Sequence, residues 1–210
     1  MREKQPGLLI GLTGLYCAGK NYVAGLLERR GLPVLELDKL GHEVLETERE
    51  AILSRFGPGV LGPGGLVDRK LLGAMVFGKP AELAALEGIV HPAVNRITET
   101  WIKKNGDRPC VINAALIHRS CAFPRLDCII LVKTPVLTRL LRARKRDRLP
   151  WTTLVKRFRS QREFTPQYFK KNTDIYTVYN HGLSGFPAFF GGPEKQIEVI
   201  LSRIGITQGS

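Results

Sequence analysis

Short apolar runs alternate with stretches of helical periodicity along most of this chain. The apolar runs predict buried strands at Leu8–Leu12, Leu32–Leu37, Cys110–Leu116, Asp127–Val132 and Ile175–Val178. Helical periodicity follows Lys20, covers most of 39–104 apart from a Gly/Pro-rich loop, lies on both sides of Pro150 and returns over Glu194–Ile204. Strands that alternate with helices are typical of an α/β fold, in which a parallel sheet has helices on both faces.

The first strand and the first helix are joined by a loop that two glycines bracket. It runs from Gly14 to Lys20 and has the form G-x-x-x-x-G-K, in the strand–loop–helix context of a phosphate-binding loop. The glycines let backbone N–H groups wrap around an anion, and the helix N-terminus and Lys20 add positive charge. Asn21 departs from the motif, which has Ser or Thr there to ligate magnesium. A glycine-rich turn that only caps a βα unit is the alternative.

Composition restricts the class of protein. The 210 residues suffice for one domain with insertions. No apolar stretch approaches the roughly 20 residues of a membrane span, and the first residues, Met1–Pro6, do not form a secretory signal, so we expect a cytoplasmic protein. The spacing of Cys17, Cys110, Cys121 and Cys128 is not that of zinc ligands, so we expect reduced thiols, three of them near a central strand.

The net charge of +13 indicates a polyanionic partner: a nucleotide, a phosphorylated metabolite or a nucleic acid. Basic residues crowd the segment 139–162, so we expect the anion site near it. Within this segment Arg142 and Arg146 lie four residues apart and therefore share one helical face. Two guanidinium groups on one face can clamp a phosphoryl group during its transfer. A solvated helix face or an RNA-binding stripe is the alternative.

Three further polar positions are candidates for catalysis or binding. Asp38 follows the second strand, at the sheet edge where α/β folds bind ligands, and its carboxylate could accept or orient a substrate hydroxyl. The alternative is an N-cap for a helix that starts near Lys39. Glu36, two residues earlier, would share the face of Asp38 as a more distant partner of a metal. His91, followed by Pro92, either marks a helix break with a packed imidazole or donates to a substrate phosphate or ribose.

Longer motifs resemble the dephospho-CoA kinase family. A first set of segments carries this resemblance: Ile10–Gly14, Gly19–Lys20, Val34–Gly41, Asp68–Phe77 and Leu86–Val94. The basic segment is similar to the family's Arg-x-x-x-Arg-Asp element at Arg142–Asp147, with Arg157 and Gln161 at the family's spacing. Asp174 and Asn180 resemble its late Ala-Asp-x-x-x-x-Asn element, with one extra residue between them.

The resemblance implies an α/β, P-loop NTPase-like fold: a parallel sheet flanked by helices, with a helical substrate-binding insert and an Arg-rich lid. The implied core comprises 7–38, 107–137 and 172–205, the insert 39–106 and the lid 138–171. The implied reaction is Mg2+-dependent transfer of the γ-phosphoryl group of ATP to the ribose 3′-hydroxyl of dephospho-CoA, which gives coenzyme A. ATP and dephospho-CoA would be the partners of a monomer that binds neither membranes nor nucleic acid.

The resemblance also implies roles for single residues. The implied catalytic residues are Lys20, Asp38, Arg142 and Arg146. The implied ATP-binding residues are Gly14, Tyr16, Cys17, Ala18, Gly19, Lys20, Asn21 and Asn180, the last near the adenine. The implied residues of the acceptor site are Thr13, Asp38, His91 and Arg146, and Asn21 is the implied metal ligand.

Some positions depart from the family pattern. Leu15 stands for a glycine, Asn21 for a serine, Glu36 for an aspartate and Arg139 for a glutamine, and 114–118 lacks the family's carboxylate. These departures affect the magnesium geometry more than the fold, because magnesium requires nearly octahedral oxygen ligands. The alternatives are another small-molecule P-loop kinase, or a non-catalytic ATP- or RNA-binding protein with a degenerate magnesium site.

Overall fold

The structure, a computed structural model, describes residues 7–160, 173–181 and 191–206. By its internal contacts the chain divides into two compact units. The core unit comprises Met1–Leu35 and Ile102–Ser210, and the insert unit comprises Glu36–Trp101. Gln161, which the family resemblance singled out, lies outside the described residues, as does the side chain of Arg157. Within the described ranges, no helix has the length and apolar character needed to cross a membrane.

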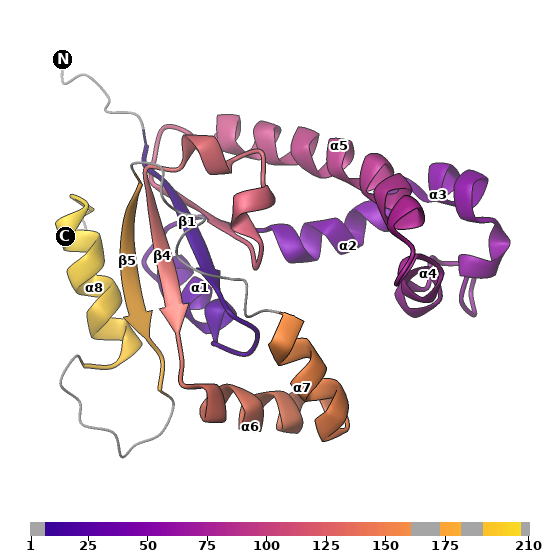
Figure 1. The fold of residues 1–210 in the computed structure, drawn as a ribbon. Coiled ribbons are helices and arrows are strands. Elements are labelled where there is room, and N and C mark those ends of the chain that lie inside the picture. Colours follow the sequence, from indigo (N-terminus) through magenta and orange to yellow (C-terminus); the bar gives the residue numbers. More distant parts are fainter. Residues whose placement is uncertain (1–6, 161–172, 182–190, 207–210) are drawn as a thin grey trace. The chain divides into compact units, whose positions relative to one another are not determined.

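A five-stranded sheet forms the centre of the core unit (Figure 1). Its strands are β1 (Leu9–Gly14), β2 (Val34–Glu36), β3 (Cys110–Asn113), β4 (Cys128–Lys133) and β5 (Asp174–Tyr179). Their order is β2-β3-β1-β4-β5, with parallel pairing of β1 to β3, β1 to β4 and β4 to β5. The α/β prediction is confirmed. Because β1 is the central strand, the loop that follows it leaves the middle of the sheet's carboxyl edge.

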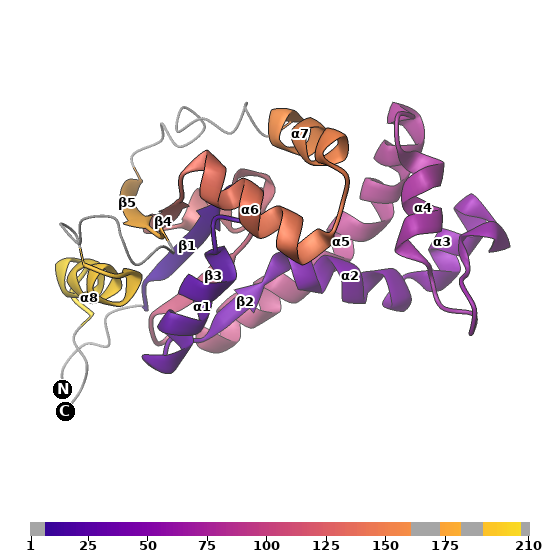
Figure 2. The same cartoon turned by 90° about the horizontal axis from the view of Figure 1, so that it is seen from below.

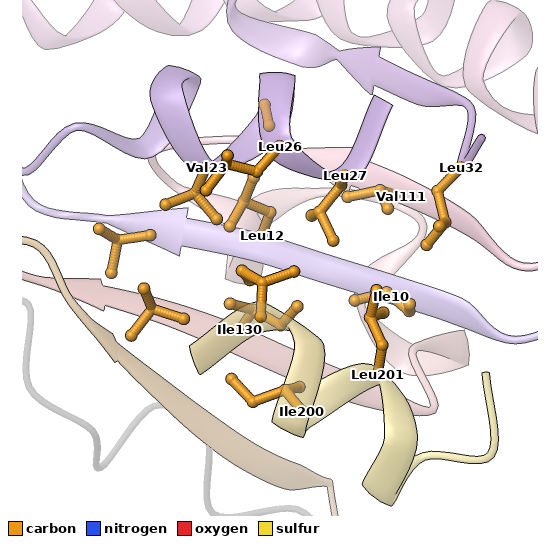
Figure 3. Packing of buried hydrophobic residues seen from close by; sticks show 14 of the residues in the cluster. Ile10, Leu12, Val23, Leu26, Leu27, Leu32, Val111, Ile130, Ile200 and Leu201 are labelled. Atoms are coloured by element: carbon orange, nitrogen blue, oxygen red, sulfur yellow. The ribbon is translucent and has the colours of Figure 1, made fainter. Parts of the chain in front are cut away.

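One face of the sheet is covered by two helices from opposite ends of the chain. Among the described residues, the helices that lie wholly in the core unit are α1 (Lys20–Arg29), α6 (Val136–Asp147), α7 (Trp151–Ser160) and α8 (Pro193–Arg203). Ile10 and Leu12 of β1 point to the same face, where they meet Leu26 and Leu27 of α1 and Ile200 of α8 (Figure 3). Burial of each such side chain contributes about 1.5–3 kcal/mol. This packing fixes the start of α1 against the end of β1.

On the opposite face of β1, neighbouring side chains lie very close to the backbone of the strand. A Cβ atom on Gly11 would lie 2.8 Å from the Leu126 side chain and 3.0 Å from that of Ile117, so only glycine fits without displacement. On the same face, the hydroxyl of fully buried Thr13 donates to the Ala115 carbonyl at 3.2 Å. The segment after β3 is therefore held beside the carboxyl end of β1.

Two predicted strands are too long. The apolar pattern predicts a strand over Leu32–Leu37, but β2 ends at Glu36 and the helix α2 (Leu37–Thr47) begins at once. The acidic Asp38 in the first turn favours a helix start there, since negative charge stabilises a helix N-terminus. Likewise β3 ends at Asn113, after which the chain turns into a 3-10 turn at Ile117–Arg119. Each strand ends at the polar residue inside the predicted run, Glu36 or Asn113.

All four cysteines are free thiols. Cys110 and Cys128 lie in the two strands that flank β1, and burial raises their pKa values to about 11 and about 12. Cys17 lies instead in the loop after β1.

The insert unit is helical. Its helices are α2, α3 (Arg49–Phe56), α4 (Arg69–Val76) and α5 (Pro80–Asn105), whose last four residues belong to the core unit. They surround a small apolar cluster in which Ile52 and Val60 are fully buried. Asp68 caps α4, because its side chain accepts the backbone N–H groups of Lys70 and Leu71 at 2.7 and 3.2 Å.

Of the two alternatives for His91-Pro92, the helix break is wrong. The helix α5 runs without interruption through Pro92, and His91 is exposed, so its imidazole is not packed either. A proline in a helix removes one i→i−4 hydrogen bond. The remaining bonds of this 26-residue helix keep it continuous.

Candidate active site

The loop between β1 and α1 has the backbone geometry of an anion cradle. Gly19 immediately precedes α1 and has φ 90° and ψ 28°, a left-handed conformation that favours glycine. The N-terminus of a helix such as α1 is a favourable site for negative charge. Figure 1 shows that the strands point toward the end of the core unit where α6 and α7 lie, and Figure 2 shows α6 passing in front of the strand ends.

The Ala18 carbonyl receives hydrogen bonds from three side chains. Asn180 Nδ2 donates at 3.0 Å, Thr134 Oγ1 at 2.8 Å and Arg142 Nη1 at 3.4 Å. Thr134 directly follows β4 and Asn180 directly follows β5, so two neighbouring strand ends and α6 all hold the same point of the loop. Arg142 also donates to the Asn180 carbonyl and to its side-chain oxygen, at 3.4 and 3.3 Å.

Lys20 begins α1, and its Nζ donates to Asn113 Oδ1 at 2.6 Å. Asn113 is fully buried at the end of β3, and its Nδ2 has no hydrogen-bond partner within the part of the chain that the structure describes. The contact directs the ammonium group of Lys20 toward the sheet edge, beside the loop.

Three arginines of α6 lie near Cys17. Arg139, Arg142 and Arg146 are three and four residues apart, on one side of the helix. Burial raises the pKa of the Cys17 thiol, and the positive charges of Arg146, Arg139 and Arg142 oppose that rise. Arg139 is itself only 4% exposed, and its burial lowers the pKa of its guanidinium. This group stacks on Phe158 of α7, with Cζ 4.7 Å from the ring centroid.

The side chain of Tyr16 contacts the end of α6. Its hydroxyl donates to Asp147 Oδ2, and the guanidinium of Arg146 lies over its ring with Cζ 5.1 Å from the centroid. Arg146 in turn pairs with Asp147, with Nε 2.7 Å from Oδ1. The Arg-x-x-x-Arg-Asp element is thus in contact with the loop after β1.

The position of Asp38 corrects the prediction from the sequence. Asp38 lies in the first turn of α2 rather than at a strand end, and the N-cap of this helix is Glu36. Both the strand-end position and the N-cap alternative for Asp38 are therefore wrong. Because a strand–helix junction separates Glu36 from Asp38, the two side chains do not share a strand face.

Asp38 has charged neighbours inside the insert unit. Burial lowers the pKa of His42, the adjacent Arg69 lowers it further, and Asp38 opposes both effects. His42 lies one helical turn after Asp38, and Arg69 begins α4. His91 is exposed on α5 of the same unit. On the insert, Arg69 supplies positive charge, and the two histidines offer ring nitrogens for hydrogen bonds.

The described residues hold no cluster of three or more His, Cys, Asp or Glu side chains that could bind a metal ion. Asn21 is exposed in the first turn of α1, where its amide offers one oxygen. Magnesium bound to a nucleotide takes most of its ligands from phosphate and water, so one protein oxygen fits such an ion.

Three contributors were missed by the sequence analysis. Asn113 could have been noticed as the single polar residue that ends the apolar run Cys110–Asn113. Thr134 and Arg139 gave no such signal, because a threonine after a strand and one arginine among many are common. Their importance arises from tertiary contacts with Ala18 and Phe158.

Comparisons with known proteins extend the likeness beyond this loop. A family model described as dephospho-CoA kinase matches residues 8–176. The dephospho-CoA kinase of Treponema pallidum is 32% identical over 216 residues, which cover 98% of this chain and 99% of the relative. That of Halalkalibacterium halodurans is 35% identical over 161 residues, which cover 74% of this chain and 80% of the relative.

A solved structure supports the same fold. The crystal structure of the protein TT1252 from Thermus thermophilus aligns with a TM-score of 0.76 at 28% identity, and the alignment covers 98% of this chain and 100% of that chain. The match therefore includes the segments of both units.

Replacement of Gly19 by alanine tests the loop geometry. A Cβ atom at Gly19 would lie 2.1 Å from Asn180 Nδ2, and φ is 90°. Gly31→Ala is the matched control, since Gly31 has φ 82° but no atom within 4 Å of its Cβ position. We expect urea unfolding to give a loss of about 1–2 kcal/mol for Gly31→Ala, the cost of a left-handed conformation, and a clearly larger loss for Gly19→Ala. Equal losses would contradict the close approach of Asn180.

Proposed function

The chain belongs to the dephospho-CoA kinase family, which phosphorylates dephospho-CoA with ATP, and we propose how its residues divide that reaction. The observation that carries the proposal is the loop after β1, with Lys20 at the helix start and the Ala18 carbonyl held by three donors. In this proposal residues 14–21 bind the phosphates of ATP. The backbone N–H groups face the oxygens, and the Lys20 ammonium lies beside the β- and γ-phosphates.

Arg142 and Arg146 are proposed to act on the phosphoryl group during transfer. The contacts of Arg142 with Ala18 and Asn180 are long, at 3.3–3.4 Å, and all go to neutral acceptors. A phosphate oxygen forms a shorter, charge-assisted hydrogen bond with a guanidinium group. Such a bond would replace the contacts of Arg142 with a net gain in binding free energy. Two guanidinium groups then neutralise the charge that develops as the bond to ADP breaks. Asn180, which remains on the loop, would lie at the nucleotide and near the adenine.

The acceptor side is proposed to depend on Asp38. Its carboxylate would accept the proton of the ribose 3′-hydroxyl as that oxygen attacks the γ-phosphorus. His91 on the insert would donate to the acceptor's polar groups. Thr13 would act indirectly, because its hydroxyl holds Ala115 beside the end of β1.

A divalent metal is part of the chemistry of P-loop kinases, and we propose that it is Mg2+ here. When bound, the ion neutralises phosphate charge and orients the phosphates. The exposed amide oxygen of Asn21, or a water that it holds, would be the protein's contribution to its ligands.

We further propose that the enzyme is a monomer of the cytoplasm, where its substrate ATP is abundant, and that its charge serves nucleotides rather than nucleic acid. Arg142 and Arg146 contact the loop after β1, and Arg139 stacks on Phe158. These contacts support a role of the positive charge in binding nucleotides. Light scattering at micromolar concentration measures the mass, and the monomer has 23.4 kDa.

A coupled ADP-release assay tests the reaction and the role of Asp38 together. We expect ADP release to require dephospho-CoA, and Asp38→Asn to lower kcat at least about 100-fold, the low end of general-base contributions. ATP affinity should not change. Glu43→Gln is the control, because Glu43 is an exposed carboxylate on the same helix. ADP release that does not depend on dephospho-CoA would contradict the kinase reaction. A normal rate for Asp38→Asn would contradict only the role of Asp38 as general base.

Titration of activity with Mg2+ tests Asn21. Serine is the residue that the motif has at this position, and its hydroxyl is a shorter ligand than an amide. We therefore expect Asn21→Ser to keep the maximal rate and to lower the Mg2+ concentration that gives half of it. If the wild-type protein is inactive at every Mg2+ concentration and only Asn21→Ser turns over, then the chain has kept the fold and lost the reaction.

A further inference from the structure

Tyr16 lies in the middle of the phosphate loop, yet its side chain makes its contacts with α6 and α7. Its hydroxyl donates to Asp147 Oδ2, at the last residue of α6. Its ring lies under the Arg146 guanidinium and meets the Phe158 ring edge-on, with centroids 5.6 Å apart and planes at 80°. Backbone binding of phosphate leaves such a side chain available for another purpose.

Asp147 joins Tyr16 to Arg146. Arg146 Nε lies 2.7 Å from Asp147 Oδ1 and Nη2 lies 3.3 Å from Oδ2, the oxygen that also accepts the Tyr16 hydroxyl. The Arg146 side chain is 61% exposed and that of Asp147 only 18%. A guanidinium group has five N–H donors, so the two used on Asp147 leave others for a phosphoryl oxygen.

We infer that Tyr16 is a positioning residue for phosphoryl transfer, which acts through Asp147 to hold Arg146 above the phosphate loop. The inference rests on the proposed role of Arg146 in transfer. An exposed arginine samples many rotamers, and ordering it in the transition state costs free energy. The Tyr16 hydroxyl fixes the carboxylate, the carboxylate fixes the Nε edge of Arg146, and the ring supports the guanidinium from below.

The position of Phe158 strengthens this inference. Phe158 packs against the Tyr16 ring on one side, and the buried guanidinium of Arg139 stacks on it at 4.7 Å. The Tyr16 ring is therefore held by neighbours whose contacts do not involve its hydroxyl. Tyr16→Phe should keep these ring contacts and remove the hydrogen bond to Asp147.

A double-mutant cycle with Arg146→Ala tests the inference by steady-state kinetics. Loss of a hydrogen bond to a charged group predicts that Tyr16→Phe lowers kcat about tenfold, with KM for ATP and dephospho-CoA within about twofold, because the interaction acts in the transition state. In the Arg146→Ala background the same change should lower kcat less than about twofold. Tyr22→Phe is the control, since Tyr22 donates to Glu194 from the exposed side of α1, and should keep the wild-type rate.

The outcomes separate this inference from the function itself. A wild-type rate for Tyr16→Phe, or a tenfold loss that persists without Arg146, overturns the inference while the role of Arg146 stands. A wild-type rate for Arg146→Ala overturns both. If the melting temperature shows that Tyr16→Phe does not fold, Asp147→Asn takes its place in the cycle, with the same tenfold loss expected and the same absence of effect without Arg146.

Discussion

The Ala18 carbonyl is the point on which the arrangement of the site depends. A loop that binds phosphate through backbone N–H groups must keep one conformation, and its glycines give it no stiffness of its own. Asn180 and Thr134 supply the stiffness from outside, from the ends of β5 and β4, and Arg142 of α6 adds to it until phosphate takes its place. The sheet order makes this possible, because β1, β4 and β5 are adjacent and parallel and so end at the same edge.

Positive charge is organised around the same loop at different depths. Lys20 is held by buried Asn113, and Arg139 is buried against Phe158, while Arg146 is largely exposed and held by Asp147. The buried groups fix positions, and the exposed one keeps donors for a ligand. Cys17 adopts φ 59° in the middle of these cations, and its raised pKa keeps the thiol protonated at neutral pH, so it adds no negative charge where phosphate would bind.

Periodicity and motif together predicted the order of strands and helices and the loop 14–20, since buried strands and G-x-x-x-x-G-K have strong local signals. The position of Asp38 was not predicted, because β2 and α2 meet without a loop. The continuity of α5 at Pro92 was not predicted either, because a long helix tolerates the loss of one backbone hydrogen bond. The contacts of Thr134 and Asn180 could not be predicted from the sequence. They join these residues to Ala18, 116 and 162 positions away along the chain, and nothing local marks them.

The central claim is that contacts on the Ala18 carbonyl hold the loop in its phosphate-binding shape. Calorimetric binding of inorganic tripolyphosphate to Thr134→Val tests it most directly, because the change removes one hydroxyl and keeps the β-branched shape. Thr100→Val is the control, since that hydroxyl donates to Arg96 of its own helix. Loss of one hydrogen bond worth about 1–1.5 kcal/mol predicts roughly tenfold weaker binding by Thr134→Val and no change for the control. Unchanged affinity of Thr134→Val would contradict the claim.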